Sequence, residues 1–281
     1  MKLNRSNKFD GVSGPLLTIV MDGVGLAAPG GGNAVDAAYT PTLDMLMKKY
    51  PMVTLRAHGK AVGLPSDDDM GNSEVGHNAL GSGQVFAQGA LLVSNSIASG
   101  KMFESKTWLD AVDNVKKNGS TLHFLGLFSD GNVHSNIAHL RSMIEHAKKD
   151  GIRTVRVHIL LDGRDVGETT ALDYVEPFEA FLASLRSPDF DAQIASGGGR
   201  MRITMDRYEA DWSMVERGWH THVLGDGRMF ASAEEAIKTL REETHAIDQD
   251  LDPFVIAKDG KPVGTIEDGD SVIFFNFRGD R

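Results

Sequence analysis

The stretch RTVRVHILLDGRDVGET, residues 153–169, contains the pattern from which the fold class of this protein can be inferred. Its first nine residues are rich in β-branched and apolar side chains, which predict a buried strand. The polar, glycine-containing second part predicts a loop. Apolar residues then recur at helical spacing from Leu172 to Leu182, which predicts a helix. The sequence therefore contains a unit of strand, loop and helix.

The same unit occurs on both sides of this stretch. Alternation of strands with helices predicts an α/β protein with a mostly parallel, doubly wound sheet. The further predicted elements are a strand at 121–128 with a helix carrying Ile137 to Ala147, a strand at 190–196 with a helix from about Asp206, a buried parallel strand at 16–21, a helix at 40–51 and a fully buried strand at 272–277.

Composition narrows the class of protein. The chain has 281 residues, 29 basic and 39 acidic, for a net charge of −10, so as a whole it repels nucleic acid and acidic membranes. It has no cysteine, which excludes disulfides and thiolate chemistry. The apolar run near the N-terminus is too short for a signal peptide or a membrane span. We expect a cytoplasmic protein, and nothing in the sequence requires an oligomer.

Charged side chains follow the predicted strands at the points where each strand ends. Ligands gather outside the carboxyl ends of parallel strands, because loops converge there and helix N-termini point their free N–H groups outward. We therefore expect a ligand site, and arginine suits phosphate or carboxylate recognition. The side chains in question are Asp22, Asp130 with His134, Arg164 with Asp165, Arg200, and Arg278 with Arg281.

The sequence GNSEVGH, residues 71–77, places Ser73 between glycines at the predicted start of a helix. Ser73 is either a helix cap or a nucleophile whose phosphate the helix N-terminus would hold. The stretch offers Ser73 no adjacent base, so a metal would have to lower its pKa. Asp22 could ligate that metal or could be an ordinary turn residue.

Two other motifs favour different functions. GVGLAA at 23–28 satisfies a dinucleotide-binding pattern, but PGGGN at 29–33 would break the helix that this pattern requires. HTH at 220–222 could bind a metal if it lay on a strand, yet no nearby carboxylate supports this, and we expect these histidines to be structural.

Six stretches, in order along the chain, together resemble the cofactor-independent (2,3-bisphosphoglycerate-independent) phosphoglycerate mutases. They span nearly the whole chain. The six are MDGVG (21–25), MGNSEVGHNALGSG (70–83), LFSDGNVHSN (127–136), LDGRDV (161–166), SGGGR with MDR (196–207) and FFNFRGDR (274–281).

The resemblance implies an enzyme of the alkaline phosphatase superfamily in which a phosphotransferase domain interrupts a phosphatase domain. Residues 1–88 would begin the phosphatase domain and 89–281 would form the phosphotransferase domain, truncated at its end. Ser73 would become phosphoserine, and Asp22 with Ser73 would ligate one of two divalent metals, with manganese favoured over magnesium or cobalt. The substrate would be bound by His134, Arg164, Asp165, Arg200, Arg207, Arg278 and Arg281, with Asp165 also a candidate acid/base.

The implied reaction is the isomerisation of 3-phosphoglycerate and 2-phosphoglycerate in glycolysis and gluconeogenesis, without 2,3-bisphosphoglycerate, by a monomer. Two departures concern the arginines: Gly279 replaces the family's usual proline, and the segment 200–207 is one residue longer, so that Arg202 competes with Arg200. Since the family's later metal ligands and substrate lysine are missing, residues 1–281 alone are expected to be inactive. A metal-dependent phosphatase, a nicotinamide dehydrogenase and a non-catalytic binding module stay as alternatives.

Overall fold

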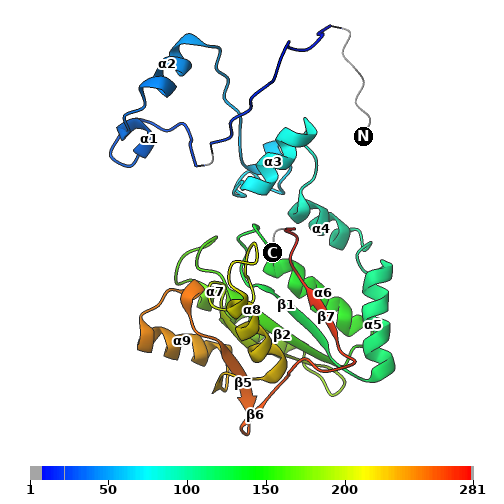
Figure 1. The fold of residues 1–281 in the computed structure, drawn as a ribbon. Coiled ribbons are helices and arrows are strands. Elements are labelled where there is room, and N and C mark those ends of the chain that lie inside the picture. Colours follow the sequence, from blue (N-terminus) through cyan, green and yellow to red (C-terminus); the bar gives the residue numbers. More distant parts are fainter. Residues whose placement is uncertain (1–7, 22, 280–281) are drawn as a thin grey trace. The chain divides into compact units, whose positions relative to one another are not determined.

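The computed structural model describes residues 8–21 and 23–279 (Figure 1). The chain forms two compact units, Met1–Leu55 and Arg56–Arg281. The boundary expected after residue 88 stays a prediction. Two of the predicted site residues, Asp22 and Arg281, lie outside the described residues.

The first unit contains helices α1 (Ala34–Ala37) and α2 (Pro41–Lys49). Helix α2 confirms the helix predicted at 40–51, and Pro41 occupies its first turn, where a missing N–H costs nothing. The buried strand predicted at 16–21 is wrong. These residues are extended but exposed, and no other described segment pairs with them. Without a neighbouring strand, their backbone N–H and C=O groups remain in water.

The second unit contains the sheet and the remaining helices (Figure 1). Its elements are η1 (Gly59–Val62), α3 (Ser73–Ser82), α4 (Gly89–Ala98), α5 (Lys106–Asn118), β1 (Leu122–Leu127), α6 (Ile137–Lys149), β2 (Thr154–Leu161), α7 (Ala171–Leu185), β3 (Asp191–Gly199), α8 (Trp212–Trp219), η2 (His220–Leu224), β4 (Arg228–Phe230), α9 (Ala233–Thr244), η3 (Asp248–Asp250), β5 (Phe254–Lys258), β6 (Lys261–Pro262) and β7 (Ser271–Phe274).

The sheet has the strand order β4-β5-β3-β2-β1-β7, and β6 pairs with β5. Pairs β1–β2, β1–β7, β2–β3 and β4–β5 are parallel, whereas β3–β5 and β5–β6 are antiparallel. A mostly parallel α/β sheet is therefore confirmed, with an antiparallel step at β5. The helix expected from about Asp206 begins only at Trp212, because Asp211 caps it by accepting a hydrogen bond from the Met214 N–H.

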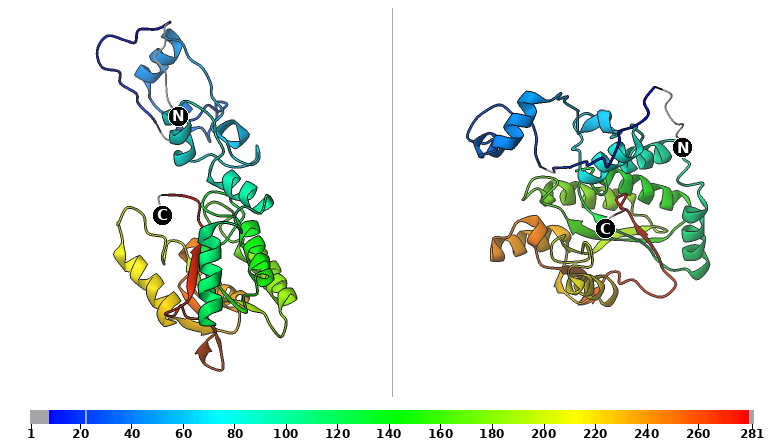
Figure 2. Two further views of the ribbon diagram at one scale, coloured as in Figure 1. Left: turned by 90° about the vertical axis from the view of Figure 1, so that its right-hand side faces the viewer. Right: turned by 45° about the horizontal axis from the view of Figure 1, so that its top comes forward.

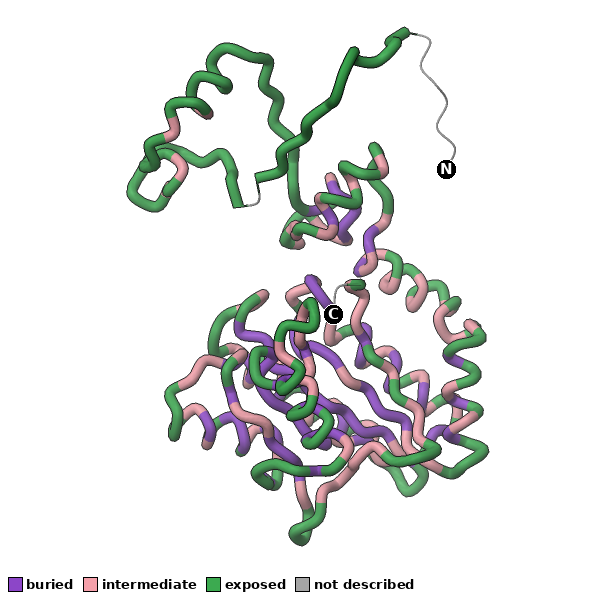
Figure 3. The backbone as a smooth tube through the Cα atoms, viewed as in Figure 1, coloured by how far each residue is buried: buried purple, intermediate pink, exposed green. Residues whose placement is uncertain are grey.

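The two faces of the sheet differ in chemistry. On β2, alternate residues from Val155 to Leu161 join the main apolar core, to which α5, α6, α7 and α9 also contribute. The residues between them face the other side, where Leu160 joins a small cluster with Ile203. The central strands are buried along most of their length (Figure 3).

Strand β7 corrects another expectation. The sequence predicted a fully buried strand at 272–277, but the strand ends at Phe274 and pairs with β1 at the edge of the sheet, beside α5 (Figure 2). Val272 and Phe274 remain 46% and 40% exposed. An edge strand has one neighbour only, so one side of its backbone and alternate side chains stay accessible.

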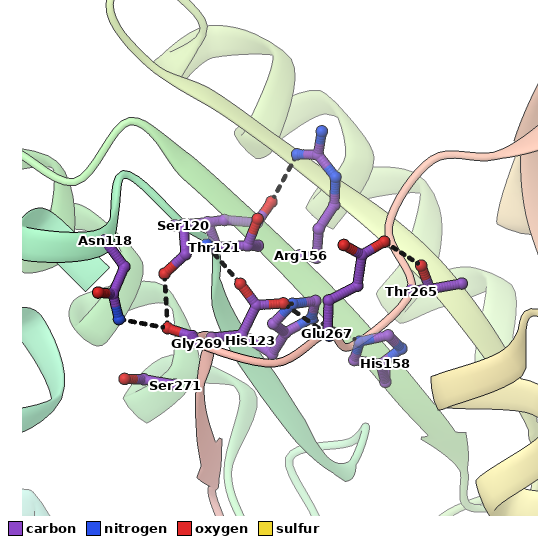
Figure 4. A network of polar contacts seen from close by, with 12 residues as sticks. Asn118, Ser120, Thr121, His123, Arg156, His158, Thr265, Glu267, Gly269 and Ser271 are labelled. Carbon is purple, nitrogen blue, oxygen red and sulfur yellow. Dashed lines mark hydrogen bonds and ion pairs between the residues drawn. The ribbon is translucent and has the colours of Figure 1, made fainter. Parts of the chain in front are cut away.

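A chain of polar side chains crosses the second face of the sheet. His123 of β1 lies beside His158 of β2, with 2.9 Å between Nδ1 and Nε2 (Figure 4). His123 Nε2 is 3.0 Å from an Asp270 carboxylate oxygen, and His158 Nδ1 is 2.7 Å from Ser196 Oγ. Ser196 Oγ is also 2.8 Å from Nδ1 of His222 in the π-helix η2. The three histidines are buried.

We expect these histidines to make the fold sensitive to acid. Burial lowers the pKa of His123 and of His158, and it lowers the pKa of His222 from 6.5 to about 3. Below pH 6.5 the unfolded chain therefore binds more protons than the folded one, and the free energy of unfolding should fall as the pH drops from about 6.5 towards 3.

Urea unfolding of the chain between pH 7.5 and 4.5 measures this slope. Each such histidine contributes up to about 1.4 kcal/mol per pH unit. His222→Gln should flatten the slope, whereas His220→Gln keeps all three buried histidines and should keep it. A free energy of unfolding that does not change over this range would contradict the expectation.

Candidate functional site

Three of the predicted site residues, His134, Asp165 and Arg200, come together at the carboxyl edge of the sheet because β1, β2 and β3 are adjacent and parallel. The loop after β1 carries His134, the loop after β2 carries Asp165, and Arg200 directly follows β3. Strand β7 is parallel to β1, so its end reaches the same edge, where the Phe277 N–H donates to the His134 carbonyl oxygen over 2.8 Å. Four loops thus converge on one place.

Arg200 is the centre of this arrangement. Its Nη1 donates to Asp162 Oδ1 over 2.8 Å and to Asp165 Oδ2 over 2.6 Å. Its Nη2 lies 2.8 Å from His134 Nε2. The side chain of Arg200 is only 2% exposed. A buried cation held by two carboxylates and an imidazole keeps all three partners in fixed positions.

Asp162 shapes the loop after β2. It is buried, and its Oδ1 accepts hydrogen bonds from the backbone N–H groups of Arg164 and Asp165, while its Oδ2 accepts from Ser129 Oγ over 2.6 Å. Gly163, which lies between Asp162 and Arg164, has a φ of +67°, a conformation that glycine adopts without strain. This tight turn points Arg164 outward, where it is exposed, and leaves Asp165 mostly covered.

The other arginines differ in their surroundings. Arg207 is half-buried and lies over the Tyr208 ring, 4.7 Å from its centroid. Arg278 pairs with Glu74 of α3, with 3.3 Å between Nε and Oε2. Arg202, the alternative to Arg200, pairs with Asp252 in an exposed position. The structure thus brings Arg200, and not Arg202, together with His134 and Asp165.

Ser73 begins helix α3 but does not cap it. The cap is Asn72, whose side chain accepts a hydrogen bond from the Val75 N–H, so the expectation that Ser73 is itself the cap is wrong. Ser73 is exposed, with its Oγ 3.2 Å from His77 Nδ1. The same nitrogen lies 2.7 Å from the Ser73 carbonyl oxygen, to which it must donate, so in this arrangement it does not accept the proton of the Ser73 hydroxyl. Residues four apart on a helix lie on the same face. The spacing of Ser73 and His77 is therefore the signal by which this contact could have been found in the sequence.

Two further polar contacts surround the site. Tyr174 of α7 donates to Asp130 Oδ1 over 2.6 Å, and burial together with this carboxylate raises the pKa of Tyr174. Asn132 donates to Asp69 Oδ1 over 2.7 Å. Asp69 therefore holds the loop that follows β1.

The described residues do not form a complete metal site. In the ranges 8–21 and 23–279, no three or more His, Cys, Asp or Glu side chains come together around a common point. Ser73 Oγ and His77 lie at the start of α3, and Asp22 is outside the description. The HTH histidines lie on a π-helix: His222 is buried against Ser196, and His220 pairs with Asp226, so they do not share a ligand.

Sequence reasoning missed Asp162, Glu74 and His77. Asp162 had a signal, since it is the first residue after β2 and precedes a glycine, as a turn carboxylate does. Glu74 had no such signal, because its partner Arg278 is about two hundred residues away along the chain.

None of the helices in the described ranges has the length and apolar character needed to cross a bilayer.

The sequence of this chain is similar to one protein family and to individual proteins that carry related names. The family BPG-independent PGAM N-terminus (iPGM_N) matches residues 93–281. A probable 2,3-bisphosphoglycerate-independent phosphoglycerate mutase of Leptospira interrogans (strain 56601) is 60% identical over 284 residues, which cover 100% of this chain and 52% of that protein. The 2,3-bisphosphoglycerate-independent phosphoglycerate mutase of Trypanosoma brucei brucei is 52% identical over 269 residues, covering 95% and 49%.

A solved structure is also similar. The crystal structure of Leishmania mexicana phosphoglycerate mutase at low cobalt concentration matches with a TM-score of 0.84 and 53% identity, over 88% of this chain and 46% of that one. The chain therefore spans about half the length of the curated relatives that it matches.

Proposed function

Because this chain belongs to the BPG-independent phosphoglycerate mutase family, we propose that it provides the nucleophile and most of the substrate-binding groups of an enzyme that interconverts 3-phosphoglycerate and 2-phosphoglycerate. The observation that carries the proposal is the assembly of His134, Asp165 and Arg200 at one edge of the sheet. Three loops from three parallel strands bring together a cation, a carboxylate and an imidazole, which suit a phosphorylated hydroxy acid.

Ser73 is the proposed nucleophile. Its hydroxyl is exposed at the first residue of a ten-residue helix, where free backbone N–H groups and the helix dipole favour a phosphate. The phosphoryl group moves from the substrate to Ser73 Oγ and returns to the other hydroxyl of glycerate. Two divalent metals, manganese first, would lower the pKa of the hydroxyl when bound. The described residues do not form a complete site for these two metals.

Asp165 is the proposed acid/base for the glycerate hydroxyls. Arg200 holds one of its oxygens, and His134 Nε2 lies 3.7 Å from that oxygen, so the orientation of the carboxylate is fixed. Arg200 already makes hydrogen bonds to Asp162, Asp165 and His134, and we propose that it acts mainly by positioning Asp165 and His134. Direct contact between Arg200 and substrate stays a prediction.

The remaining arginines are proposed to hold the anionic groups of the substrate. Arg164 is exposed, and Arg207 and Arg278 lie in the loops that follow β3 and β7. Arg281 is assigned from its sequence motif alone. During the reaction, free glycerate must be retained through its small carboxylate, and bidentate arginine contacts are suited to this.

The cellular role follows from the reaction. We propose that the enzyme acts in glycolysis and gluconeogenesis, in the cytoplasm and as a monomer. A metal-dependent phosphatase is the alternative function. It would need Ser73, but it would not need the buried group of Asp162, Asp165 and Arg200. In the proposed mechanism this group orients an acid/base for the second hydroxyl of glycerate, and a phosphatase transfers no phosphoryl group to such a hydroxyl.

A coupled enolase assay tests the proposed function. A polypeptide of the relatives' full length that contains this chain receives 3-phosphoglycerate, without 2,3-bisphosphoglycerate, in the presence or absence of Mn²⁺. Metal-dependent formation of 2-phosphoglycerate is expected. Release of inorganic phosphate without isomerisation would favour the phosphatase, and binding without turnover would favour a binding module.

A matched pair of arginines sharpens this test. Arg164 follows β2 at the carboxyl edge, whereas Arg153 precedes β2 at the opposite edge, and both are exposed. In the same assay, Arg164→Ala should weaken substrate binding by about ten- to a hundredfold, the effect of one or two lost charged hydrogen bonds. Arg153→Ala should have no effect. Equal effects of the two substitutions would place the substrate elsewhere.

A further inference from the structure

The segment 200–207 connects β3 to the loop before α8 and carries Arg200 and Arg207 at its two ends. Its backbone is unusual. Thr204 has φ of +66°, in the left-handed region that β-branched residues rarely adopt. Such strain persists only where surrounding contacts impose it, and it is concentrated at functional sites. What holds Thr204 in this conformation therefore matters for both arginines.

Three contacts hold Thr204. Its backbone N–H donates to the Met214 carbonyl oxygen over 3.0 Å. Its Oγ1 lies 3.1 Å from His222 Nε2. Gly218 of α8 allows the close approach, because a Cβ at this position would be 2.3 Å from Thr204 Oγ1. The neighbours Ile203 and Met205 are both buried in the small cluster on the second face of the sheet.

The histidine chain sets the direction of the bond to Thr204. Asp270 can only accept, so His123 donates to it through Nε2 and accepts at Nδ1. His158 must then donate through Nε2 to His123 and accept at Nδ1 from Ser196. Ser196 in turn accepts from His222 Nδ1.

This order leaves His222 Nε2 without a proton, so Thr204 Oγ1 donates to it. The order requires neutral imidazoles, and burial lowers the pKa of all three histidines. The hydrogen-bond network therefore fixes the tautomer of His222, with the proton on Nδ1. At position 204, only a side chain that donates a hydrogen bond can pair with His222 Nε2.

We propose that Thr204 is a positioning residue: the hydrogen bond from its hydroxyl to His222 fixes the segment 200–207 and thereby places Arg207 relative to Arg200. The hydroxyl is the point at which a network anchored on the second face of the sheet holds the loop that bears the two arginines. The expected effect of Thr204 on substrate affinity rests on the proposed function, whereas its expected effect on the conformation of the segment 200–207 does not.

The first experiment measures hydrogen exchange of the amides of residues 200–209 in the chain without ligand. Thr204→Val keeps the shape of the side chain and removes the donor, and it should raise exchange in this segment at least about tenfold. Thr204→Ser keeps the donor and should restore protection. Thr221→Val is the matched control, because Thr221 is a buried neighbour of His222 whose hydroxyl donates to the Arg217 carbonyl oxygen.

The second experiment measures affinity for 3-phosphoglycerate by calorimetry with the same substitutions in a polypeptide of the relatives' full length that contains this chain. Thr204→Val should lose affinity about tenfold or more while Thr221→Val, although destabilised, keeps it. If Thr204→Val fails to fold, Gly218→Ala displaces the same hydroxyl from the opposite side and should have the same two effects.

Exchange equal to the wild type in Thr204→Val would overturn the proposal, and so would raised exchange with unchanged affinity. If the wild type does not bind 3-phosphoglycerate, the proposed function fails for this chain, whereas the exchange result still decides whether Thr204 fixes the segment.

Discussion

Ser73→Ala is expected to abolish mutase turnover, by at least about 10³-fold, in a polypeptide of the relatives' full length that contains this chain. The reason is that no other hydroxyl at the start of α3 could accept the phosphoryl group in its place. The substitution should scarcely alter stability, because Asn72 caps the helix and Ser73 does not. The wild type should give a phosphoserine at position 73 by mass spectrometry after brief mixing with substrate.

Ser82→Ala is the matched control for Ser73. Ser82 ends the same helix, and its Oγ donates to the Asn78 carbonyl oxygen over 2.7 Å. Its loss should leave turnover intact. Normal turnover in Ser73→Ala would show that the phosphoryl group does not pass through this serine, and the proposed mechanism would then be wrong.

Arg200→Ala is expected to produce the largest loss of stability. It removes the cation from a buried cluster and leaves Asp162 and Asp165 without their shared partner. Breaking a buried pair by removing one member costs about 3–5 kcal/mol, because a charge remains buried and uncompensated. Urea unfolding of the chain measures the change in the free energy of unfolding.

Arg202→Ala is the control for Arg200. The two arginines are two residues apart, but Arg202 pairs with Asp252 where both side chains are about half exposed. Exposed ion pairs contribute about 0–1 kcal/mol, so this variant should unfold nearly as the wild type does. If Arg202→Ala were the more damaging substitution, the assignment of Arg200 to the centre of the site would be wrong.

Much of the candidate site could be predicted from the sequence because it depends on local rules. In parallel sheets, polar residues after strand ends meet at one edge, and this rule alone predicts that His134, Asp165 and Arg200 lie together, as they do. The strand at 153–161 and the helices carrying Ile137 to Ala147 and Leu172 to Leu182 followed from apolar composition and spacing, and the structure confirms them. Each of these inferences needs only neighbours along the chain.

The failures share a different cause. The run at 16–21 has the composition of a strand, yet a strand requires a partner, and no described segment provides one. The run at 272–277 is apolar enough for the centre of a sheet, but its place at the edge depends on the order of the strands. Apolar composition reports that burial is possible, whereas the extent of burial depends on what packs against the segment.

The α/β class, the meeting of His134, Asp165 and Arg200 at one edge of the sheet and the family to which the chain belongs could be inferred from the sequence without a structure. Only the tertiary structure decided which arginine is buried, that Asp162 holds Arg200, and that Thr204 is tied to His222 across the sheet. The physical reason is that periodicity and motifs encode contacts between near neighbours, whereas a buried charge or hydroxyl is defined by partners that the folded chain brings from distant positions.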